Sequence, residues 1–194
     1  MKTKNILLNT FFVLVLGGAL FYSYQSGKKN QKIDPTLIEL ESPGGKKSIK
    51  DFNGKYNLVY FGFLTCPDIC PTTLKTITRV FNELNPTELE KIQMLFIDLD
   101  PERDSLEGMK IYTSNFHKQI IPLRTDVEQL KNITDGFGIY FKKVPLEGSN
   151  MGYTIDHSTG ILFLDPKGEL ISVLDHDASV DQMLAIIRLE MKKT

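Results

Sequence analysis

Residues 58–75 read Leu58-Val59-Tyr60-Phe61-Gly62-Phe63-Leu64-Thr65-Cys66-Pro67-Asp68-Ile69-Cys70-Pro71-Thr72-Thr73-Leu74-Lys75. Residues 58–64 are apolar or aromatic apart from one glycine, which is typical of a buried strand. From Pro71 the sequence takes on a helical pattern with a proline in its first turn. Cys66 and Cys70 therefore stand where a strand ends and a helix begins. If both lie in or next to that turn, their spacing of four residues places them on one face of the helix.

The chemistry open to this pair follows from its place in the chain. Cys66 and Cys70 are the only cysteines, which is too few for a disulfide scaffold. A helix N-terminus favours anions, so thiols placed there tend to ionise. Two thiolates on one side of a helix start can either close a disulfide or hold a soft metal ion.

The rest of the chain supplies further strands and helices. Strands are expected at residues 57–64, 91–99, up to Arg124, 154–156, 160–165 and 169–174, and a hairpin is expected from 37–40 across the turn at 43–45. Helices are expected at 71–84, from Asp104 to about His117, from Asp126, and at 179–191. Asp104 is predicted to be the N-cap of its helix, with Glu107 as the capping-box partner.

This order of elements predicts an α/β fold. Strand, helix, strand and helix followed by a strand hairpin and a C-terminal helix give a thioredoxin-like mixed sheet flanked by helices, with an N-terminal hairpin before it. In such a sheet, chemistry gathers at the carboxyl ends of the strands, where the cysteine pair is expected. With 194 residues and 41% hydrophobic content, the chain can bury one core. Its net charge of −1 gives no reason to expect a nucleic acid as partner.

The N-terminus predicts a membrane segment. After a short segment, 1–5, residues 6–24 are almost wholly apolar, about the length of a bilayer crossing. We interpret them as an uncleaved, single transmembrane helix, with a cleaved signal peptide as the alternative. We expect residues 25–36 to form a polar linker and residues 37–194 to form one thioredoxin-like domain that carries the cysteine pair. The start lacks the character of a mitochondrial presequence. We therefore expect a single-pass protein of a bacterial cell membrane, with the domain on the outer face.

A third ligand for the cysteine pair is sought among three histidines. His157 precedes the strand at 160–165, in a segment that the predicted topology brings to the cysteine helix. His117 is expected at a helix end and His176 in a solvated turn. Two thiolates and one imidazole fall short of the four ligands of structural zinc, and no general base for catalytic zinc is evident. Copper suits the set, as trigonal Cu(I) or as Cu(II) with a fourth ligand. Residue types alone leave copper and a purely redox dithiol open.

Three motifs in order carry a resemblance to a known family. The sequence Cys66-Pro67-Asp68-Ile69-Cys70-Pro71, the later Asp100-Pro101-Glu102-Arg103-Asp104, and Asp156-His157-Ser158 resemble the Sco/SenC family. The resemblance implies a thioredoxin-like fold that binds copper through Cys66, Cys70 and His157. It also implies a partner, the copper-centre subunit of cytochrome c oxidase or another cuproprotein, to which copper is delivered or whose cysteines are reduced. Leu64-Thr65 departs from the Thr-His that relatives often have before the first cysteine.

Two carboxylates are candidate supporting residues. Asp100, at the end of a strand adjacent to the cysteine strand, could supply a fourth oxygen or an outer hydrogen bond to the ligands. The alternative for Asp100 is a turn residue before Pro101. The resemblance implies an aspartate here that influences copper binding. Asp68 would add negative charge near the helix N-terminus.

Three functions remain in competition at this level. The first is a membrane-anchored copper metallochaperone, which is not an enzyme. The second is a thiol–disulfide reductase in which Cys66 and Cys70 are the redox-active pair that keeps the acceptor's cysteines reduced. The third is a copper or redox sensor whose disulfide changes a binding surface.

Overall fold

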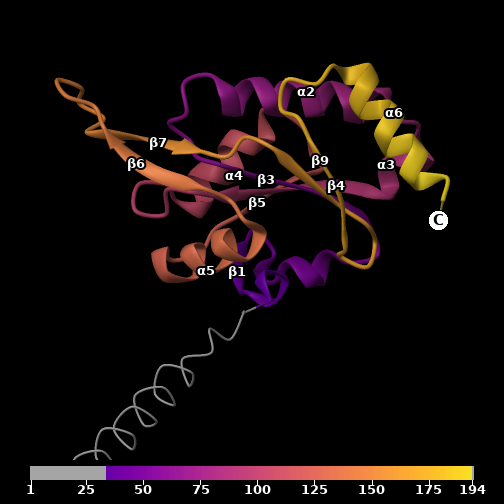
Figure 1. Ribbon diagram of the computed structural model, residues 1–194, viewed down its shortest axis with the longest axis horizontal. Coiled ribbons are helices and arrows are strands. Elements are labelled where there is room, and N and C mark those ends of the chain that lie inside the picture. Colours follow the sequence, from indigo (N-terminus) through magenta and orange to yellow (C-terminus); the bar gives the residue numbers. More distant parts are fainter. Residues whose placement is uncertain (1–33, 194) are drawn as a thin grey trace, which may run out of the picture. The chain divides into compact units, whose positions relative to one another are not determined.

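The computed structural model describes residues 34–193. Its centre is a five-stranded sheet with the strand order β5–β4–β3–β8–β9 (Figure 1). The strands are β3 (Tyr56–Gly62), β4 (Ile92–Asp98), β5 (Ile120–Leu123), β8 (Ile161–Leu164) and β9 (Leu170–Leu174). β4 pairs in parallel with β3 and β5, whereas β8 is antiparallel to β3 and β9 to β8. The predicted thioredoxin-like mixed sheet is thus confirmed.

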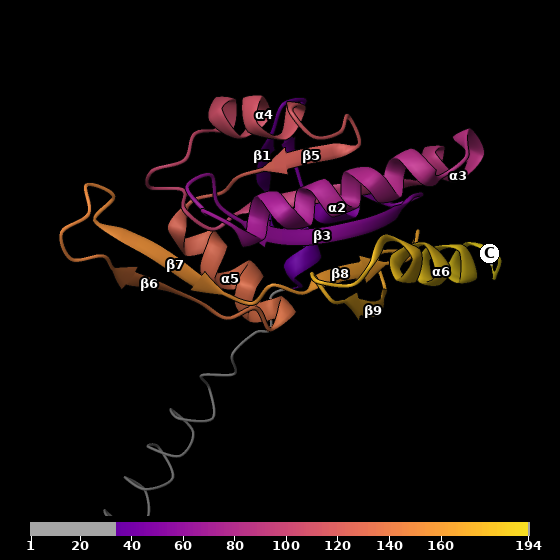
Figure 2. The ribbon, with the colours of Figure 1, turned by 90° about the horizontal axis from the view of Figure 1, so that it is seen from above.

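Helices cover both faces of this sheet. They are α2 (Ile69–Glu83), α3 (Pro86–Glu90), α4 (Leu106–Ser114), α5 (Val127–Phe137) and α6 (Val180–Met191). Figures 1 and 2 show α2, α4 and α6 on one face and α5 on the other. Because the β3–α2–β4 and β4–α4–β5 crossovers run in the same direction and parallel crossovers are right-handed, α2 and α4 must share a face.

The core lies between these layers. Every residue of β3 and β4 is buried, which explains why both strands read as nearly continuous apolar runs. The helix α2 adds a buried stripe at helical spacing. The stripe comprises Cys70, Leu74, Ile77 and Phe81. Cys70 is therefore both the first member of a core stripe and a member of the cysteine pair.

Of two helix N-caps that the sequence predicted, one is confirmed and one is wrong. Asp126 caps α5, as expected, by accepting the Gln129 N–H. Asp104 does not cap α4: the cap is Ser105, whose hydroxyl oxygen accepts the Gly108 N–H, and the helix ends at Ser114 rather than near His117. Asp104 instead points inward and is 5% exposed. Two adjacent polar residues compete for a cap, and only the tertiary structure decides between them.

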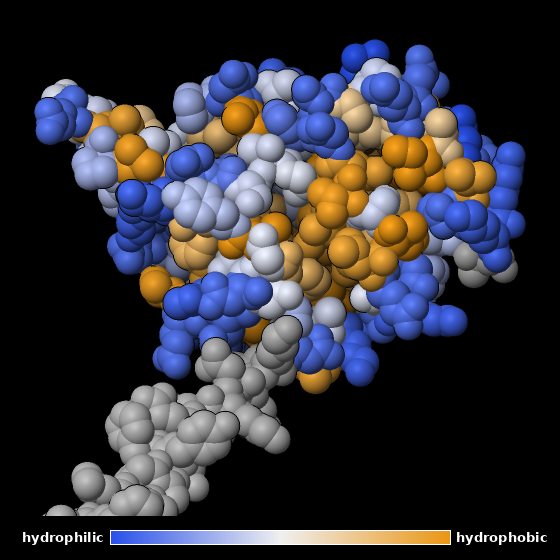
Figure 3. All heavy atoms as spheres, in the orientation of Figure 1, coloured by the Kyte–Doolittle hydropathy of each residue, from blue (hydrophilic) through white to orange (hydrophobic). Residues whose placement is uncertain are grey.

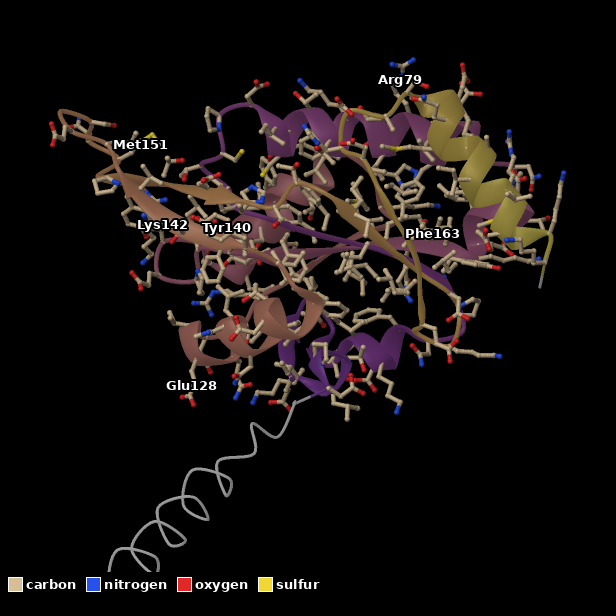
Figure 4. The ribbon with its side chains drawn as sticks, viewed as in Figure 1. Arg79, Glu128, Tyr140, Lys142, Met151 and Phe163 are labelled. Carbon is tan, nitrogen blue, oxygen red and sulfur yellow. The ribbon has the colours of Figure 1, made fainter. Side chains whose placement is uncertain are left out.

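Two small sheets flank the central one. The predicted N-terminal hairpin is present, but its first strand is β1 (Leu40–Ser42) rather than 37–40, because the 3-10 helix η1 (Pro35–Leu37) takes up the start of that segment. After the turn come β2 (Gly45–Lys47) and the 3-10 helix η2 (Ile49–Phe52). The strand β6 (Phe141–Pro145) was not expected from the sequence. It pairs with β7 (Tyr153–His157) in a protruding hairpin. Figure 4 shows Tyr140 and Lys142 at the inner part of this hairpin and Met151 toward its outer end.

Apolar side chains also remain on the surface. Figure 3 shows an apolar area over β9 and α6, at the sheet edge opposite β5. Leu170 and Val173 of β9 and Leu189 of α6 each expose more than half of their surface. The predicted transmembrane segment, 6–24, lies outside the described residues. Within residues 34–193, no helix combines the length and the apolar character needed to cross a membrane.

Candidate metal centre

The two cysteines lie at the carboxyl end of β3, on either side of the start of α2. Cys66 is half-buried in the loop, and Cys70 is buried in the first turn of the helix. The helix begins at Ile69, two residues earlier than the sequence indicated, so only Cys70 is helical. The Cys70 N–H donates to Cys66 Sγ at 3.4 Å. A first-turn amide, which has no partner inside the helix, is thus satisfied by the sulfur.

Gly62, the last residue of β3, allows Cys70 to approach the sheet. A Cβ atom at this position would lie 2.7 Å from Phe96 Cε2 and 3.0 Å from Cys70 Sγ. Real Cβ atoms do not approach ring carbons that closely, so any larger residue at Gly62 would displace the buried thiol. This explains the single glycine in an otherwise apolar strand.

His157 completes the cluster from the far side. It is the last residue of β7, not a loop residue, and its Nε2 lies 3.9 Å from Cys70 Sγ. Its Nδ1 lies 2.8 Å from the Ser158 carbonyl oxygen. Because a carbonyl only accepts hydrogen bonds, Nδ1 carries the proton, and Nε2 presents its lone pair to the cysteines. Edge-on contacts with the rings of Tyr60 and Phe63 hold the imidazole in place.

The two thiols differ strongly in acidity. The hydrogen bond from the Cys70 thiol lowers the pKa of Cys66 to about 4, with further help from the Cys70 and Asp68 backbone N–H groups. The same hydrogen bond to Cys66, together with burial, raises the pKa of Cys70. Burial and the nearby cysteines also raise the pKa of Tyr60, whose hydroxyl contacts Cys70 Sγ at 3.8 Å. The pKa shifts of the two thiols thus favour ionisation of Cys66 over ionisation of Cys70.

These three residues form a ligand set for a soft metal ion. Cys66 Sγ, Cys70 Sγ and one nitrogen of His157 all lie within 4.8 Å of one another. With metal–ligand bonds of about 2.0–2.3 Å, neighbouring ligand atoms lie roughly 3.5–4 Å apart. The set therefore needs only a small contraction to bind a metal. A disulfide needs the two sulfurs at about 2.05 Å, which is a larger movement of the Cys66 loop.

The other two histidines lie elsewhere. His117 packs its ring against Phe81 at 5.1 Å between centroids, and burial lowers its pKa. His176 contacts the Thr159 hydroxyl and the Asp175 carboxylate, each at 3.1 Å. Asp175, His176 and Asp177 also place ligand atoms within 4.8 Å of one another, but both carboxylates are exposed in a turn. As the topology predicted, His157 is the histidine that reaches the cysteines.

Asp100 is committed to other partners. It is fully buried, accepts the Tyr153 hydroxyl at 2.7 Å and forms an ion pair with Arg103 Nε. Arg103 in turn donates to the carbonyls of Met151 and Tyr153, both at 2.9 Å. The loop after β4 therefore fixes the start of β7, the strand that ends at His157. The sequence predicted Asp100 as a supporting residue and Arg103 as paired nearby with Asp104, but not the contacts of either with residues 151–153, because those contacts depend on the unexpected hairpin.

Two more buried carboxylates lie beside Asp100. Asp98 is fully buried; its Oδ1 accepts the Asp100 N–H, and its carboxyl also hydrogen-bonds to Asp104. Burial, with the charges of Asp104 and Asp100, raises the pKa of Asp98 to about 8. Asp104 Oδ2 accepts the Leu64 N–H at 2.7 Å. Asp104 thus holds the loop that carries Cys66, a role that the sequence analysis did not assign.

Asp68 is placed as the sequence predicted, but its role stays a prediction. It is the N-cap residue of α2, yet its carboxylate makes no capping hydrogen bond. The exposed carboxylate accepts the Thr72 hydroxyl at 3.3 Å. Its backbone N–H, rather than its charge, contacts Cys66 and lowers the pKa of that thiol.

Comparisons with known proteins agree with this geometry. A family model described as SCO1/SenC matches residues 28–192. Protein SCO2, mitochondrial, of Saccharomyces cerevisiae is 33% identical over an alignment of 205 positions. The alignment covers 94% of this chain and 66% of the yeast protein. The structure of Bradyrhizobium japonicum ScoI with copper bound has a TM-score of 0.70 at 30% identity, covering 78% of this chain and 96% of that one. Yeast Sco1 with copper bound has a TM-score of 0.72 at 32% identity, covering 81% and 87%.

Proposed function

The chain belongs to the SCO1/SenC family, and from that membership and the geometry of the cluster we propose that it binds one copper ion through Cys66, Cys70 and His157. The observation that carries this proposal is the mutual proximity of two sulfurs and one unprotonated imidazole nitrogen within 4.8 Å. Soft thiolates select Cu(I), and three ligands satisfy its trigonal coordination; Cu(II) would take a fourth ligand. Copper is the cargo of the protein, destined for the binuclear copper centre of cytochrome c oxidase or another cuproprotein.

The three ligands have different roles in the binding and release of copper. Cys66 is half-exposed and ionised, so an incoming copper ion meets a thiolate there first. Cys70 loses its proton on binding, which couples loading to proton release. His157 closes the set with its free Nε2. Release follows by ligand exchange, in which the acceptor's cysteines replace the exposed Cys66 first and the buried Cys70 last.

The experiment is copper loading of the reduced full-length chain. Cu(I) is supplied without oxygen from a competing chelator, and bound copper is measured after desalting. The wild-type chain is expected to retain one copper, and a Cys66→Ser/Cys70→Ser double variant none. Thr65→Ser, next to Cys66 and outside the ligand set, is the matched control and should load fully. Equal loading of the double variant would exclude the site.

Thiol–disulfide reduction is the second candidate, and the unequal acidity of the two cysteines favours it. In this reaction the Cys66 thiolate attacks an acceptor disulfide and forms a mixed disulfide, releasing one acceptor thiolate. The Cys70 thiol then gives up its proton and attacks Cys66 Sγ. The acceptor leaves with two reduced thiols, and the protein keeps a Cys66–Cys70 disulfide. Cys70→Ser should trap the mixed disulfide, whereas Cys66→Ser should not.

We further propose that residues 6–24 anchor the chain in a bacterial membrane with the domain on its outer face. An apolar run of about the length of a bilayer crossing, followed by a lysine-rich linker, supports this. The mature N-terminus, determined by mass spectrometry of membrane-extracted protein, tests the proposal. A terminus near residue 20 would show that the segment is cleaved.

A further inference from the structure

A hollow of about 370 Å³ lies at the β5 edge of the sheet, between α4, β5 and the β1–β2 turn. Figure 2 shows these three elements side by side, and contacts join β5 to both α4 and β1. No residue of the candidate metal centre lines the hollow. Part of its surface is apolar. These apolar lining residues are Pro43, Phe52, Ile120, Ile121 and Pro122.

Every charged side chain that lines the hollow is a cation. These are Lys47, Lys110 and Lys118, and no carboxylate is among the lining residues. Lys110 reaches Glu107 only at 3.7 Å, and both side chains are more than half exposed, so this pair is weak. Lys47 lies over the Phe52 ring at 5.4 Å. Within residues 34–193 neither Lys47 nor Lys118 forms an ion pair, although Lys47 lies near enough to Asp51 to lower the pKa of that carboxyl.

Of the remaining polar side chains, the hydroxyls have no proton left for an anion, whereas the His117 ring keeps one. The hydroxyls of Thr113 and Ser114 are already used, because they donate to the carbonyls of Lys110 and Ile111. His117 Nδ1 accepts the Gln119 N–H at 3.1 Å, which places the proton of the neutral ring on Nε2. The hollow therefore combines ammonium groups and a ring N–H with an apolar floor.

We propose that this hollow binds an anionic amphiphile, a molecule with one carboxylate or phosphate head and a short apolar tail. The three lysines would neutralise the head, and Phe52, Ile120 and Ile121 would cover the tail. Because a water molecule occupies about 30 Å³ in the liquid, the volume admits roughly a dozen non-hydrogen atoms. A fatty acid of eight to ten carbons, or the same length of a lipid chain with its head group, matches that size. An inorganic anion would leave the apolar floor uncovered, and a neutral alcohol would gain nothing from the charge of the lysines.

Photolabelling of the full-length chain in phosphatidylcholine nanodiscs tests this proposal. The probe is octanoate with a diazirine in its tail, and labelled peptides are mapped by mass spectrometry. Labels are expected in peptides that contain residues 47–52 and 110–122. Excess octanoate or octyl phosphate should reduce this labelling at least tenfold. Octanol and inorganic phosphate should not.

Variants inside and outside the hollow distinguish binding of the probe in the hollow from general binding to the protein surface. Lys118→Gln should reduce labelling at least threefold, and Lys118→Arg should restore it. Lys91→Gln removes the same charge from an exposed position outside the hollow, and it should label as the wild type does. Competition by phosphatidylglycerol placed in the nanodisc would identify a membrane lipid as the source, and its failure would identify a free amphiphile. Equal competition by octanol, or equal loss in Lys91→Gln, would overturn the proposal.

Discussion

Two clusters of ionisable side chains lie at the carboxyl ends of two neighbouring strands, and they serve opposite purposes. In the thiol–imidazole cluster, the cysteines follow β3 and His157 ends β7; the carboxylate cluster, Asp98, Asp100 and Asp104, lies at the end of β4 and in the loop after it. The strands pair in parallel with Gly62 opposite Asp98. Cys66, Cys70 and His157 keep ligand atoms available to one another within 4.8 Å. The carboxylates are buried and largely committed to hydrogen bonds.

The topology of the sheet brings both clusters to neighbouring strand ends. The clusters differ because the carboxylates already form hydrogen bonds within the protein, whereas the cysteine and histidine ligand atoms remain available to a metal ion. Asp104 holds the cysteine loop through the Leu64 N–H, and Asp100 holds β7 through Tyr153 and Arg103. The carboxylate cluster thus holds the two segments that carry the ligands, the cysteine loop and β7. We expect perturbations of the first cluster to change metal affinity most, and perturbations of the second to change stability and positioning.

The largest effect should come from oxidising the cysteine pair. Closing the Cys66–Cys70 disulfide removes two of the three ligands at once, because only the thiolate binds the metal. We expect Cu(I) affinity to fall at least about 1,000-fold, which corresponds to roughly 4 kcal/mol. Competition with a Cu(I) chelator, on anaerobically reduced and on oxidised protein, measures this ratio. Similar affinities in the two forms would mean that sulfur is not the ligand.

Removing the imidazole should have the next largest effect. His157→Ala leaves both thiolates in place, so we expect Cu(I) affinity to fall about 10- to 100-fold, or roughly 1.4–2.7 kcal/mol. A thiol titration should show that the disulfide still forms, since His157 is not part of it. His176→Ala, which alters a histidine in the turn after β9, serves as the control and should leave affinity unchanged. A variant that loses disulfide formation would assign His157 to loop structure instead.

How far the sequence could predict these two clusters depends on the range of the interactions. Cys66 and Cys70 were found because a strand-to-helix junction is a local pattern, and His157 because topology brings its strand to that junction. Asp104 was misassigned as a helix cap, because its partner is the Leu64 N–H, forty residues away. The role of Tyr153 was not predicted, because it depends on the β6–β7 hairpin. The strand β6 is polar and half-exposed, so its sequence lacks the apolar pattern that would have indicated a strand.

Neutralising the buried carboxylate should change the pH dependence of stability. Asp98 has a pKa of about 8 in the fold against 3.8 for an unperturbed group, so the native state binds more protons than the unfolded state between these values. Stability therefore falls as pH rises from about 4 to about 8 and then levels off. Asp98→Asn should remove this contribution and make the reduced, metal-free protein more stable than the wild type at pH 8. Little difference is expected near pH 4.

Urea unfolding followed by tyrosine fluorescence at several pH values measures this effect. Asp177→Asn, which neutralises an exposed carboxylate, is the matched control and should leave the pH dependence as in the wild type. If Asp98→Asn destabilises the protein at pH 8, the carboxyl is ionised in the native state and its burial is compensated by another partner.

A smaller change is expected when Asp100 loses its charge. Asp100→Asn keeps an oxygen for the Tyr153 hydroxyl but leaves Arg103 without its carboxylate. Because these contacts fix the strand of His157, we expect Cu(I) affinity to fall about 3- to 5-fold, or roughly 0.7–1 kcal/mol. Adding His157→Ala to Asp100→Asn separates the two roles. If Asp100 acts through His157, the second substitution hides the effect of the first. A full additive loss would instead show that Asp100 acts on copper affinity independently of His157.

The smallest effect is expected at Asp68, although it stands between the two cysteines in sequence. Its carboxylate is exposed and points to Thr72, and the contact that lowers the pKa of Cys66 comes from its backbone N–H. Asp68→Asn keeps that N–H and removes only a solvent-screened charge. We therefore expect Cu(I) affinity to change less than about twofold at physiological salt, where exposed charges interact weakly. Repeating the chelator competition at low and high salt gives the sharper test. A change that grows beyond fivefold at low salt would place the Asp68 charge among the determinants of copper binding. The position of Asp68 between the two cysteines would then matter more than the hydrogen bonds that its carboxylate forms.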